Sequence, residues 1–260
     1  MTLHAQQEII KTQQEGSVWY LKLNRPEKRN ALNDATLQRL ECLFNNIPET
    51  VRCLVLSSEG PHFSAGLDLS ELTERDLAAG MAHSRMWHKV LESIQFCKAP
   101  VIVVLQGACV GGGLELASAC HIRIAEESTF FALPEGQRGI FLGGGGSVRL
   151  PRLIGLANVM DMMLTGRVYN AIEGHAVGLS QYQVANGKGL ELAKELADKI
   201  AANAPMTNYA ITQVLPRIAE GSFDSGLMME ALIAAIAQDS QEAKQRMQAF
   251  LDGKAKKVGE

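Results

Sequence analysis

The chain has 260 residues, of which 47% are hydrophobic and 20% charged, a composition typical of a globular protein and not of a disordered one. Its formal net charge of −3 gives no overall excess of Lys and Arg for neutralising phosphates, so we expect no nucleic-acid partner. Apolar runs such as Val101–Leu105 are far shorter than the roughly 18 residues of a membrane span. Residues 1–16 have neither the basic start nor the apolar stretch of a signal peptide. We therefore expect a cytoplasmic protein without a membrane partner.

The first half of the chain alternates apolar strands with amphipathic helices. Residues 17–23 and 53–57 are predicted strands, and Asn33 is the predicted N-cap of a helix that runs to about Phe44. A second helix is predicted from about Gly80 to Cys97, before a strand at 101–105 that is apolar throughout and is therefore expected to be buried on both faces. This repeated β-then-α order predicts an α/β fold.

The second half begins with a glycine turn at residues 111–113, which opens a short helix that ends near Ala119. Further predicted strands cover 122–125 and about 129–131, and the glycines at 143–146 open another helix. From about Gly189 onward the period is helical, and the predicted helices are 189–202, 206–219, 223–238 and 241–251. We therefore divide the chain into a core of residues 1–195 and a C-terminal helical region of residues 196–260.

The C-terminal region carries an apolar stripe, which includes Leu227, Met228, Leu232, Ile233 and Ile236. Such a stripe must be covered by another layer of structure. Two interpretations stay open at this point, since the stripe can pack within its own chain or against another subunit.

The glycine and cysteine patterns exclude several classes of site. Gly111 and Gly113 begin a Gly-x-Gly pattern, but Leu116 stands where a dinucleotide fingerprint needs its third glycine, and no Gly-Lys-Ser/Thr closes a phosphate loop. Neither the six histidines nor the five cysteines have the spacing of paired metal ligands. We therefore expect no metal and no nucleotide cofactor, and we expect reduced, buried thiols.

Two glutamates stand beside glycine-rich turns. Glu115 ends the run Gly-Gly-Gly-Leu-Glu at 111–115, and Glu135 lies in Pro-Glu-Gly at 134–136. In a partly apolar cleft, two such carboxyl groups can act as an acid/base pair, because burial and their mutual repulsion tune their pKa values. The bare backbone at 111–113 and the loop at 62–68 add N–H groups that could stabilise an oxyanion.

Four segments of the chain, at residues 24–32, 63–69, 107–117 and 131–155, carry motifs in a recognisable order and spacing. In these segments the chain resembles the crotonase, or enoyl-CoA hydratase/isomerase, superfamily. Each motif alone is weak, but together they are specific, since the two glutamates are 20 residues apart as the hydratase pattern requires. The resemblance implies a spiral of ββα units with a C-terminal helical region that forms a homotrimer or a dimer of trimers.

The resemblance also implies a reaction and the residues that carry it. The implied activity is that of an enoyl-CoA hydratase, which adds water syn across the double bond of a 2-enoyl-CoA to give a 3-hydroxyacyl-CoA. Glu115 matches the residue that activates water for attack at Cβ, and Glu135 matches the one that delivers a proton to Cα. The backbone N–H groups of Leu67 and Gly112 fall at the oxyanion-hole positions. No cofactor is implied, because coenzyme A is part of the substrate.

Further positions match the stretches that contact coenzyme A in the family, namely Lys28, Arg29, Ala31, Ala65 and Asp68. The sequence departs from the family pattern at His121, at Gly136, along 142–146 and at Ser70, which leaves linear, branched and aryl acyl groups open. Three alternatives to a hydratase also stay open: an enoyl-CoA isomerase, a C–C lyase of the same superfamily, and a non-catalytic homologue that binds acyl-CoA or RNA.

Overall fold

The computed structural model describes residues 8–71 and 76–254 and divides the chain into two compact units, residues 1–201 and 202–260. The boundary follows the end of α7 (Gly189–Ala201), whereas the sequence analysis placed it at 195/196, inside this helix. The reason for the difference is packing, because Ala193 and Ala197 of α7 are buried in a core shared with the sheet of the first unit. A helical period alone could not show that α7 belongs there.

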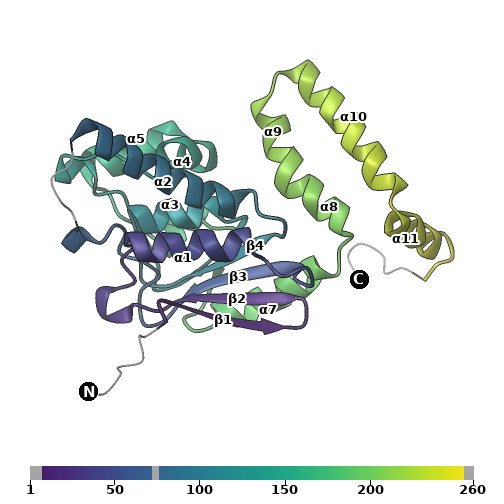
Figure 1. Ribbon diagram of the computed structural model, residues 1–260, viewed down its shortest axis with the longest axis horizontal. Coiled ribbons are helices and arrows are strands. Elements are labelled where there is room, and N and C mark those ends of the chain that lie inside the picture. The colour runs from purple at the N-terminus through teal and green to yellow at the C-terminus, as the bar shows by residue number, and fades with distance from the viewer. Residues whose placement is uncertain (1–7, 72–75, 255–260) are drawn as a thin grey trace. The chain divides into compact units, whose positions relative to one another are not determined.

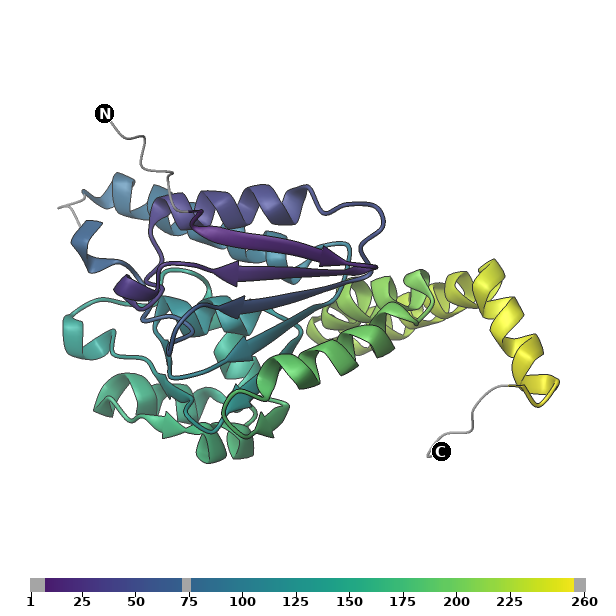
Figure 2. The ribbon, with the colours of Figure 1, turned by 90° about the horizontal axis from the view of Figure 1, so that it is seen from below.

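The larger sheet of the first unit orders its strands β1-β2-β3-β4-β6-β9, with β1 antiparallel to β2 and every other neighbour parallel. These strands, side by side in Figure 2, are β1 (Ile10–Glu15), β2 (Val18–Leu23), β3 (Cys53–Ser58), β4 (Val101–Leu105), β6 (Ile122–Glu126) and β9 (Tyr182–Val184). The sequence analysis missed β1, since only Ile10 of its six residues is buried. It also missed β9, a strand of three residues.

Helices cover both faces of this sheet because alternate residues of a strand point to opposite sides. Leu54 and Leu56 of β3 pack in the larger core with α1 (Asp34–Asn45) and α2 (Leu77–Gln95), while Cys53 and Val55 pack in the smaller core under α7. Figure 1 shows α1 and α2 on one face of the sheet and α7 on the other. The prediction that β4 is buried on both faces is confirmed, since all five of its residues are buried.

A second, smaller sheet positions the candidate site. It orders its strands β5-β7-β8, with β5 (Ala108–Val110) parallel to β7 (Phe130–Ala132) and β7 antiparallel to β8 (Tyr169–Asn170). The remaining helices of the first unit are α3 (Gly112–Ala119), α4 (Gly146–Ile154), α5 (Leu156–Thr165) and α6 (Ala171–Val177), with three short 3-10 turns at Pro26–Lys28, Leu69–Glu71 and Gly136–Arg138.

The predicted start of α1 is confirmed, because the side chain of Asn33 accepts a hydrogen bond from the N–H of Thr36. Helix α2 begins three residues before the predicted Gly80, since Asp76 caps it by accepting from the N–H of Ala79.

The regular elements in the described part of the second unit are all helices. It comprises α8 (Pro205–Tyr209), a π-helical turn (Ala210–Val214), α9 (Leu215–Glu220), α10 (Phe223–Asp239) and α11 (Gln241–Leu251). The sequence analysis predicted one helix over 206–219. The π-turn widens it just before Pro216, which has no N–H to donate to the carbonyl four residues earlier. In the described parts of the chain, no helix is both long and apolar enough to cross a membrane.

Candidate active site

The two glutamates emerge from the carboxyl ends of neighbouring parallel strands. Val110, the last residue of β5, pairs with Ala132, the last residue of β7. Glu115 follows β5 on the buried helix α3, and Glu135 follows β7 at the start of the 3-10 turn. The carboxyl ends of parallel strands meet at one edge of a sheet, so both side chains reach the same cavity. Side chains 20 residues apart in the sequence are thereby brought together.

Two glycines of the run at 143–146, Gly144 and Gly146, form a cradle around the carboxylate of Glu115. Its Oε1 accepts hydrogen bonds of 2.8 Å from the N–H groups of Gly144 and Gly146. A Cβ atom on Gly146 would lie 2.7 Å from Glu115 Cγ, and one on Gly144 would lie 3.1 Å from its Oε2. Both contacts are tighter than ordinary van der Waals contact, so a side chain at Gly146 displaces the carboxylate. A side chain at Gly144 would press on the carboxylate and would also meet Trp87 at 2.9 Å.

Glu135 is held against another glycine. A Cβ atom on Gly111 would lie 2.6 Å from Glu135 Oε1, and Gly111 has a φ of +52°, which suits glycine in particular. The Oε2 atom of Glu135 is buried and has no hydrogen-bond partner among the described residues. A buried carboxyl oxygen without a partner is costly to folding, which is typical of a group kept for a ligand or a reaction.

Burial raises the pKa of both carboxyl groups. Glu115 is 4% exposed; burial raises its pKa, against the opposing effect of the Gly146 and Gly144 N–H groups and the positive charge of Arg149. Glu135 is 7% exposed; burial raises its pKa, and the negative charge of Glu115 raises it further, while its own backbone N–H and Arg138 lower it. Raised pKa values in a cavity are typical of carboxyl groups that exchange protons with a substrate.

The backbone N–H groups of Leu67 and Gly112 lie next to each other beside the glutamates. Leu32 donates to the Gly66 carbonyl at 2.7 Å and accepts from the Asp68 N–H at 2.9 Å, a parallel pairing that turns the N–H of Leu67 to the opposite side. Gly112 is the first residue of α3, so its N–H has no acceptor within the helix. A Cβ atom on Gly112 would lie 3.4 Å from the Leu67 nitrogen, so the two residues are close neighbours in the lining of the cavity.

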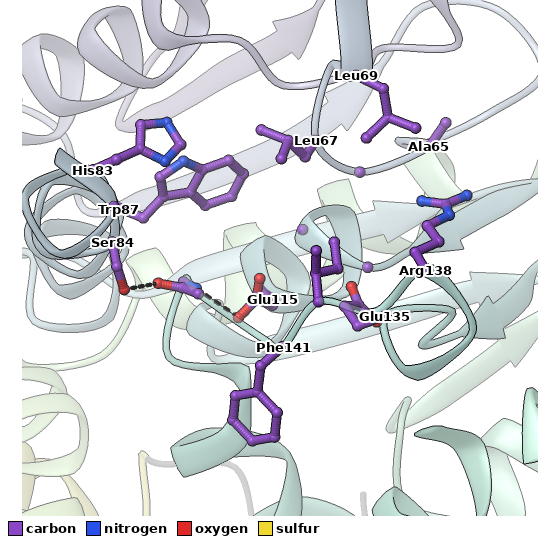
Figure 3. Close-up of a pocket in the computed structure, with 17 residues that line it drawn as sticks. Ala65, Leu67, Leu69, His83, Ser84, Trp87, Glu115, Glu135, Arg138 and Phe141 are labelled. Atoms are coloured by element: carbon purple, nitrogen blue, oxygen red, sulfur yellow. Dashed lines mark hydrogen bonds between the residues drawn. The ribbon is translucent and has the colours of Figure 1, made fainter. Parts of the chain in front are cut away.

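The cavity that these groups share has a volume of about 360 Å³. Besides the glutamates, the glycines and Leu67, it is lined by Ala65, Leu69, His83, Ser84, Trp87, Arg138, Ile140 and Phe141 (Figure 3). Sequence reasoning missed all of these except Ala65. One signal was available, because positions 80, 83, 84 and 87 of α2 share one helix face. Nothing in the local sequence indicated that this face is turned toward the glutamates.

Of the residues matched to coenzyme A contacts, only Ala65 lines the cavity in the described chain. Lys28 and Arg29 are exposed, and the Arg29 carbonyl accepts from the Ala65 N–H at 3.0 Å, so the two segments are adjacent. Ala31 is buried. The carboxylate of Asp68 pairs with the Arg25 guanidinium at 2.8 Å. The Asp68 side chain therefore faces into the protein. A ligand that lies along this segment would contact the backbone of Asp68 and not its carboxylate.

The departures from the family pattern have structural explanations. His121 accepts from the Val101 N–H at 2.9 Å through Nδ1 and lies 3.0 Å from the Gln95 carbonyl through Nε2. It is outside the cavity lining, and burial lowers its pKa to about 4. A Cβ atom on Gly136 would lie 2.3 Å from the Met163 carbonyl, so α5 requires glycine there. Ser70 donates to Asp68 through both its hydroxyl and its N–H.

The cysteines are free thiols, and four of the five are buried. Cys42 of α1 is exposed, so the expectation of burial is wrong for this residue, which lies on the outer face of the helix. No cluster of three or more His, Cys, Asp and Glu side chains suited to a metal occurs in the described parts of the chain.

Comparison with known proteins gives a consistent result. The family model described as "Enoyl-CoA hydratase/isomerase" matches residues 13–258. The chain is 32% identical to the short-chain-enoyl-CoA hydratase of Clostridium acetobutylicum, over 92% of this chain and 93% of the other. It is 33% identical to the 2,3-dehydroadipyl-CoA hydratase of Escherichia coli K12, over 94% and 95%. A crystal structure of a putative enoyl-CoA hydratase from Rhodopseudomonas palustris superposes with a TM-score of 0.92 at 56% identity, over 95% of each chain.

Proposed function

Since the chain belongs to the enoyl-CoA hydratase/isomerase family, we propose that it is an enoyl-CoA hydratase that adds water syn across the double bond of a 2-enoyl-CoA. One observation supports this proposal most strongly. Two buried glutamates with raised pKa values line one cavity together with Leu67 and Gly112. Hydration needs a base, an acid and donors for an oxyanion, and the two carboxyl groups and the backbone N–H groups of Leu67 and Gly112 can supply them.

In the first step, the thioester oxygen accepts hydrogen bonds from the N–H groups of Leu67 and Gly112. The ionised carboxylate of Glu115 takes a proton from a water molecule, and the water oxygen bonds to Cβ. The π electrons of the double bond move to form the thioester enolate, whose negative charge the two N–H groups stabilise. In enzymes generally, removing one such donor costs about 2.7–4 kcal/mol.

In the second step, the protonated carboxyl of Glu135 gives its proton to Cα and the thioester carbonyl is restored. The product is a 3-hydroxyacyl-CoA. Glu115 then carries the proton taken from water, and Glu135 is ionised, so transfer of one proton from the first to the second regenerates the enzyme. Because both carboxyl groups reach the cavity from the same edge of the small sheet, hydroxyl and proton arrive on the same side of the double bond.

The reaction balances without a cofactor, since acid, base and oxyanion donors all come from the chain. The coenzyme A part of the substrate lies along the segments at 28–31 and 65–68, which the Arg29–Ala65 hydrogen bond joins. Along these segments the exposed cations Lys28 and Arg29 face the phosphates of coenzyme A, since guanidinium and ammonium groups bind phosphate well. Ala31, Ala65 and Asp68 contribute backbone contacts.

The working enzyme is a homotrimer or a dimer of trimers in the cytoplasm. Four residues of the apolar stripe on α10 support this assembly, because Leu227, Met228, Leu232 and Ile236 are each more than half exposed in the single chain. A stripe of this kind is covered when it packs against another subunit. Light scattering coupled to size exclusion tests the assembly, and a stable monomer would contradict it.

Incubation with a panel of linear, branched, aryl and dicarboxylic 2-enoyl-CoAs tests the function, with product masses measured by mass spectrometry. A hydratase increases the mass by one water. An isomerase leaves the mass unchanged while the double bond moves, and a C–C lyase splits the acyl chain. The acyl group turned over with the highest kcat/KM identifies the substrate class, and the absence of any product containing added water would refute the proposed activity.

A further inference from the structure

One peptide group lies between Ser84 and Glu115. The Ser84 hydroxyl donates to the Gly143 carbonyl at 2.7 Å, and the next N–H along the chain, that of Gly144, donates to Glu115 Oε1 at 2.8 Å. Figure 3 shows this relay from α2 through the glycine loop to the carboxylate. Ser84 is 59 residues from Gly143 in the sequence, so the contact is a tertiary one that holds the loop from outside.

The carbonyl of Gly143 and the N–H of Gly144 belong to the same planar unit. The peptide bonds of the described chain are trans, so this C=O and this N–H point in opposite directions. Fixing the carbonyl on the Ser84 side therefore aims the N–H at Glu115. Glycine flanks the peptide on both sides and restricts its rotation little, so the orientation must come from the hydrogen bonds at its two ends.

The Ser84 hydroxyl is itself held in place. Its proton is directed at Gly143, so its oxygen is free to accept from His88 Nε2, 3.3 Å away on the next turn of α2. A second link ties α2 to the same loop, because Arg149 donates to the Gly144 carbonyl at 3.1 Å and to Gln95 Oε1 at 2.7 Å. Helix α2 thus holds the glycine loop at two points.

We propose that Ser84 is a positioning residue for the hydration reaction, which orients the Gly143–Gly144 peptide so that its N–H holds Oε1 of Glu115. This inference rests on the proposed function. With Oε1 occupied by the N–H groups of Gly144 and Gly146, Oε2 is the oxygen that takes the proton from water. Ser84 acts on the base through the peptide and does not touch the reacting atoms.

Removal of the hydroxyl has a defined consequence. In Ser84→Ala the Gly143–Gly144 peptide is free to rotate, and Glu115 loses one of its two backbone donors for part of the time. We expect kcat to fall about tenfold, which corresponds to about 1.4 kcal/mol and matches the loss of one hydrogen bond. KM changes less than twofold, because the N–H groups that hold the thioester are unaffected.

The pH dependence distinguishes positioning from a purely structural role. The charged and titratable groups around Glu115 are Glu135, which follows β7, and Arg149 from α4. Arg138 of the 3-10 turn and His83 of α2 line the same cavity, and His88 of α2 lies 3.3 Å from the Ser84 hydroxyl. Backbone donors stabilise the ionised form of Glu115. Weakening one of them moves the acid limb of the kcat/KM profile to higher pH.

The test compares Ser84→Ala with Ser84→Thr, which keeps the hydroxyl, and with Ser93→Ala. Ser93 lies on the same helix, but its hydroxyl donates to the Val90 carbonyl of α2 itself. We expect Thr to restore most of the lost kcat and Ser93→Ala to behave as wild type. In a Glu115→Gln background, Ser84→Ala should cause no further loss. An equal loss in both backgrounds, or a fully active Ser84→Ala, would overturn the proposal.

Hydrogen exchange gives a readout that does not depend on activity. The amide of Gly144 should exchange faster in Ser84→Ala than in wild type, while the amides of α1 stay protected. If Ser84→Ala does not fold, Ser84→Cys provides a weaker donor of similar shape and should show an intermediate rate. Unchanged exchange at Gly144 refutes the positioning role. If the wild type turns over no enoyl-CoA, the proposed function is refuted instead. The exchange rate of Gly144 then still decides whether Ser84 orients the Gly143–Gly144 peptide.

Discussion

Replacing Gly146 with alanine tests the cradle of Glu115 with a single methyl group. Gly146 is the first residue of α4, and its φ lies outside the left-handed region, so alanine can adopt its backbone conformation. The new Cβ would lie 2.7 Å from Glu115 Cγ and 2.9 Å from Oε1. The variant therefore perturbs the carboxylate and leaves the helix intact.

The size of the effect follows from these distances. Carbon atoms in contact are about 3.5–4.0 Å apart, so Glu115 must move by about 1 Å to clear the methyl group. A displacement of about 1 Å in a catalytic group can lower activity about 100-fold, which corresponds to about 2.7 kcal/mol in activation free energy. For the free energy of unfolding, the better helix propensity of alanine and the weakened hydrogen bond to Glu115 oppose each other, so we expect a change within about 2 kcal/mol.

Steady-state turnover of a 2-enoyl-CoA measures the loss, and thermal unfolding shows whether the fold is retained. Gly226→Ala is the matched control, because Gly226 is also a helical glycine and its new methyl group would meet Ile218 at an ordinary 3.4 Å. We expect Gly226→Ala to keep wild-type kcat and Gly146→Ala to lose about 100-fold. A folded Gly146→Ala with more than half of the wild-type kcat would refute the role of the cradle.

Two further predictions follow from the shifted pKa values of Glu135, in the cavity, and of His121, outside it. Arg138 lowers the pKa of Glu135, so we expect Arg138→Leu to raise that pKa. Because Glu135 acts as the protonated acid, the basic limb of the kcat/KM profile then moves to higher pH. In Arg138→Lys, which keeps the positive charge, the basic limb stays in place. His121 has a pKa lowered from 6.5 to about 4, so the unfolded chain binds more protons between these values and stability falls as the pH drops from 6.5 to 4. Urea unfolding across this range should show a shallower fall in His121→Gln, and an unchanged slope would contradict the assignment of His121 as a buried neutral side chain.

The sequence was sufficient to predict the elements whose signals are local. The strand at 101–105 is apolar at every position, and Asn33 caps a helix by its side-chain chemistry alone. The glycine runs next to Glu115 and Glu135 are likewise visible in the sequence, although the carboxylates that these glycines approach belong to distant residues. The strand, the cap and the glycine runs can be read from one sequence because each depends on residues that are close together in the chain.

Features that depend on distant partners were not predictable in this way. Strand β1 is mostly polar and forms through pairing along the whole length of β2. The carboxylate of Asp68 accepts a hydrogen bond from the guanidinium of Arg25, which is 43 residues away in the sequence. Ser84 has no local signature, since its hydroxyl matters only where α2 meets the glycine loop. The boundary at 201/202 likewise depends on α7 packing against the sheet.

The most direct test of the central claim is the turnover of Glu115→Gln and Glu135→Gln, measured as the loss of enone absorbance on the preferred 2-enoyl-CoA. Glutamine keeps the shape of the side chain but can neither take nor give the proton. With both variants folded, as judged by their thermal unfolding, the account predicts that each loses at least about 100-fold in kcat. Either variant retaining wild-type hydration would contradict the assignment of the two glutamates as base and acid.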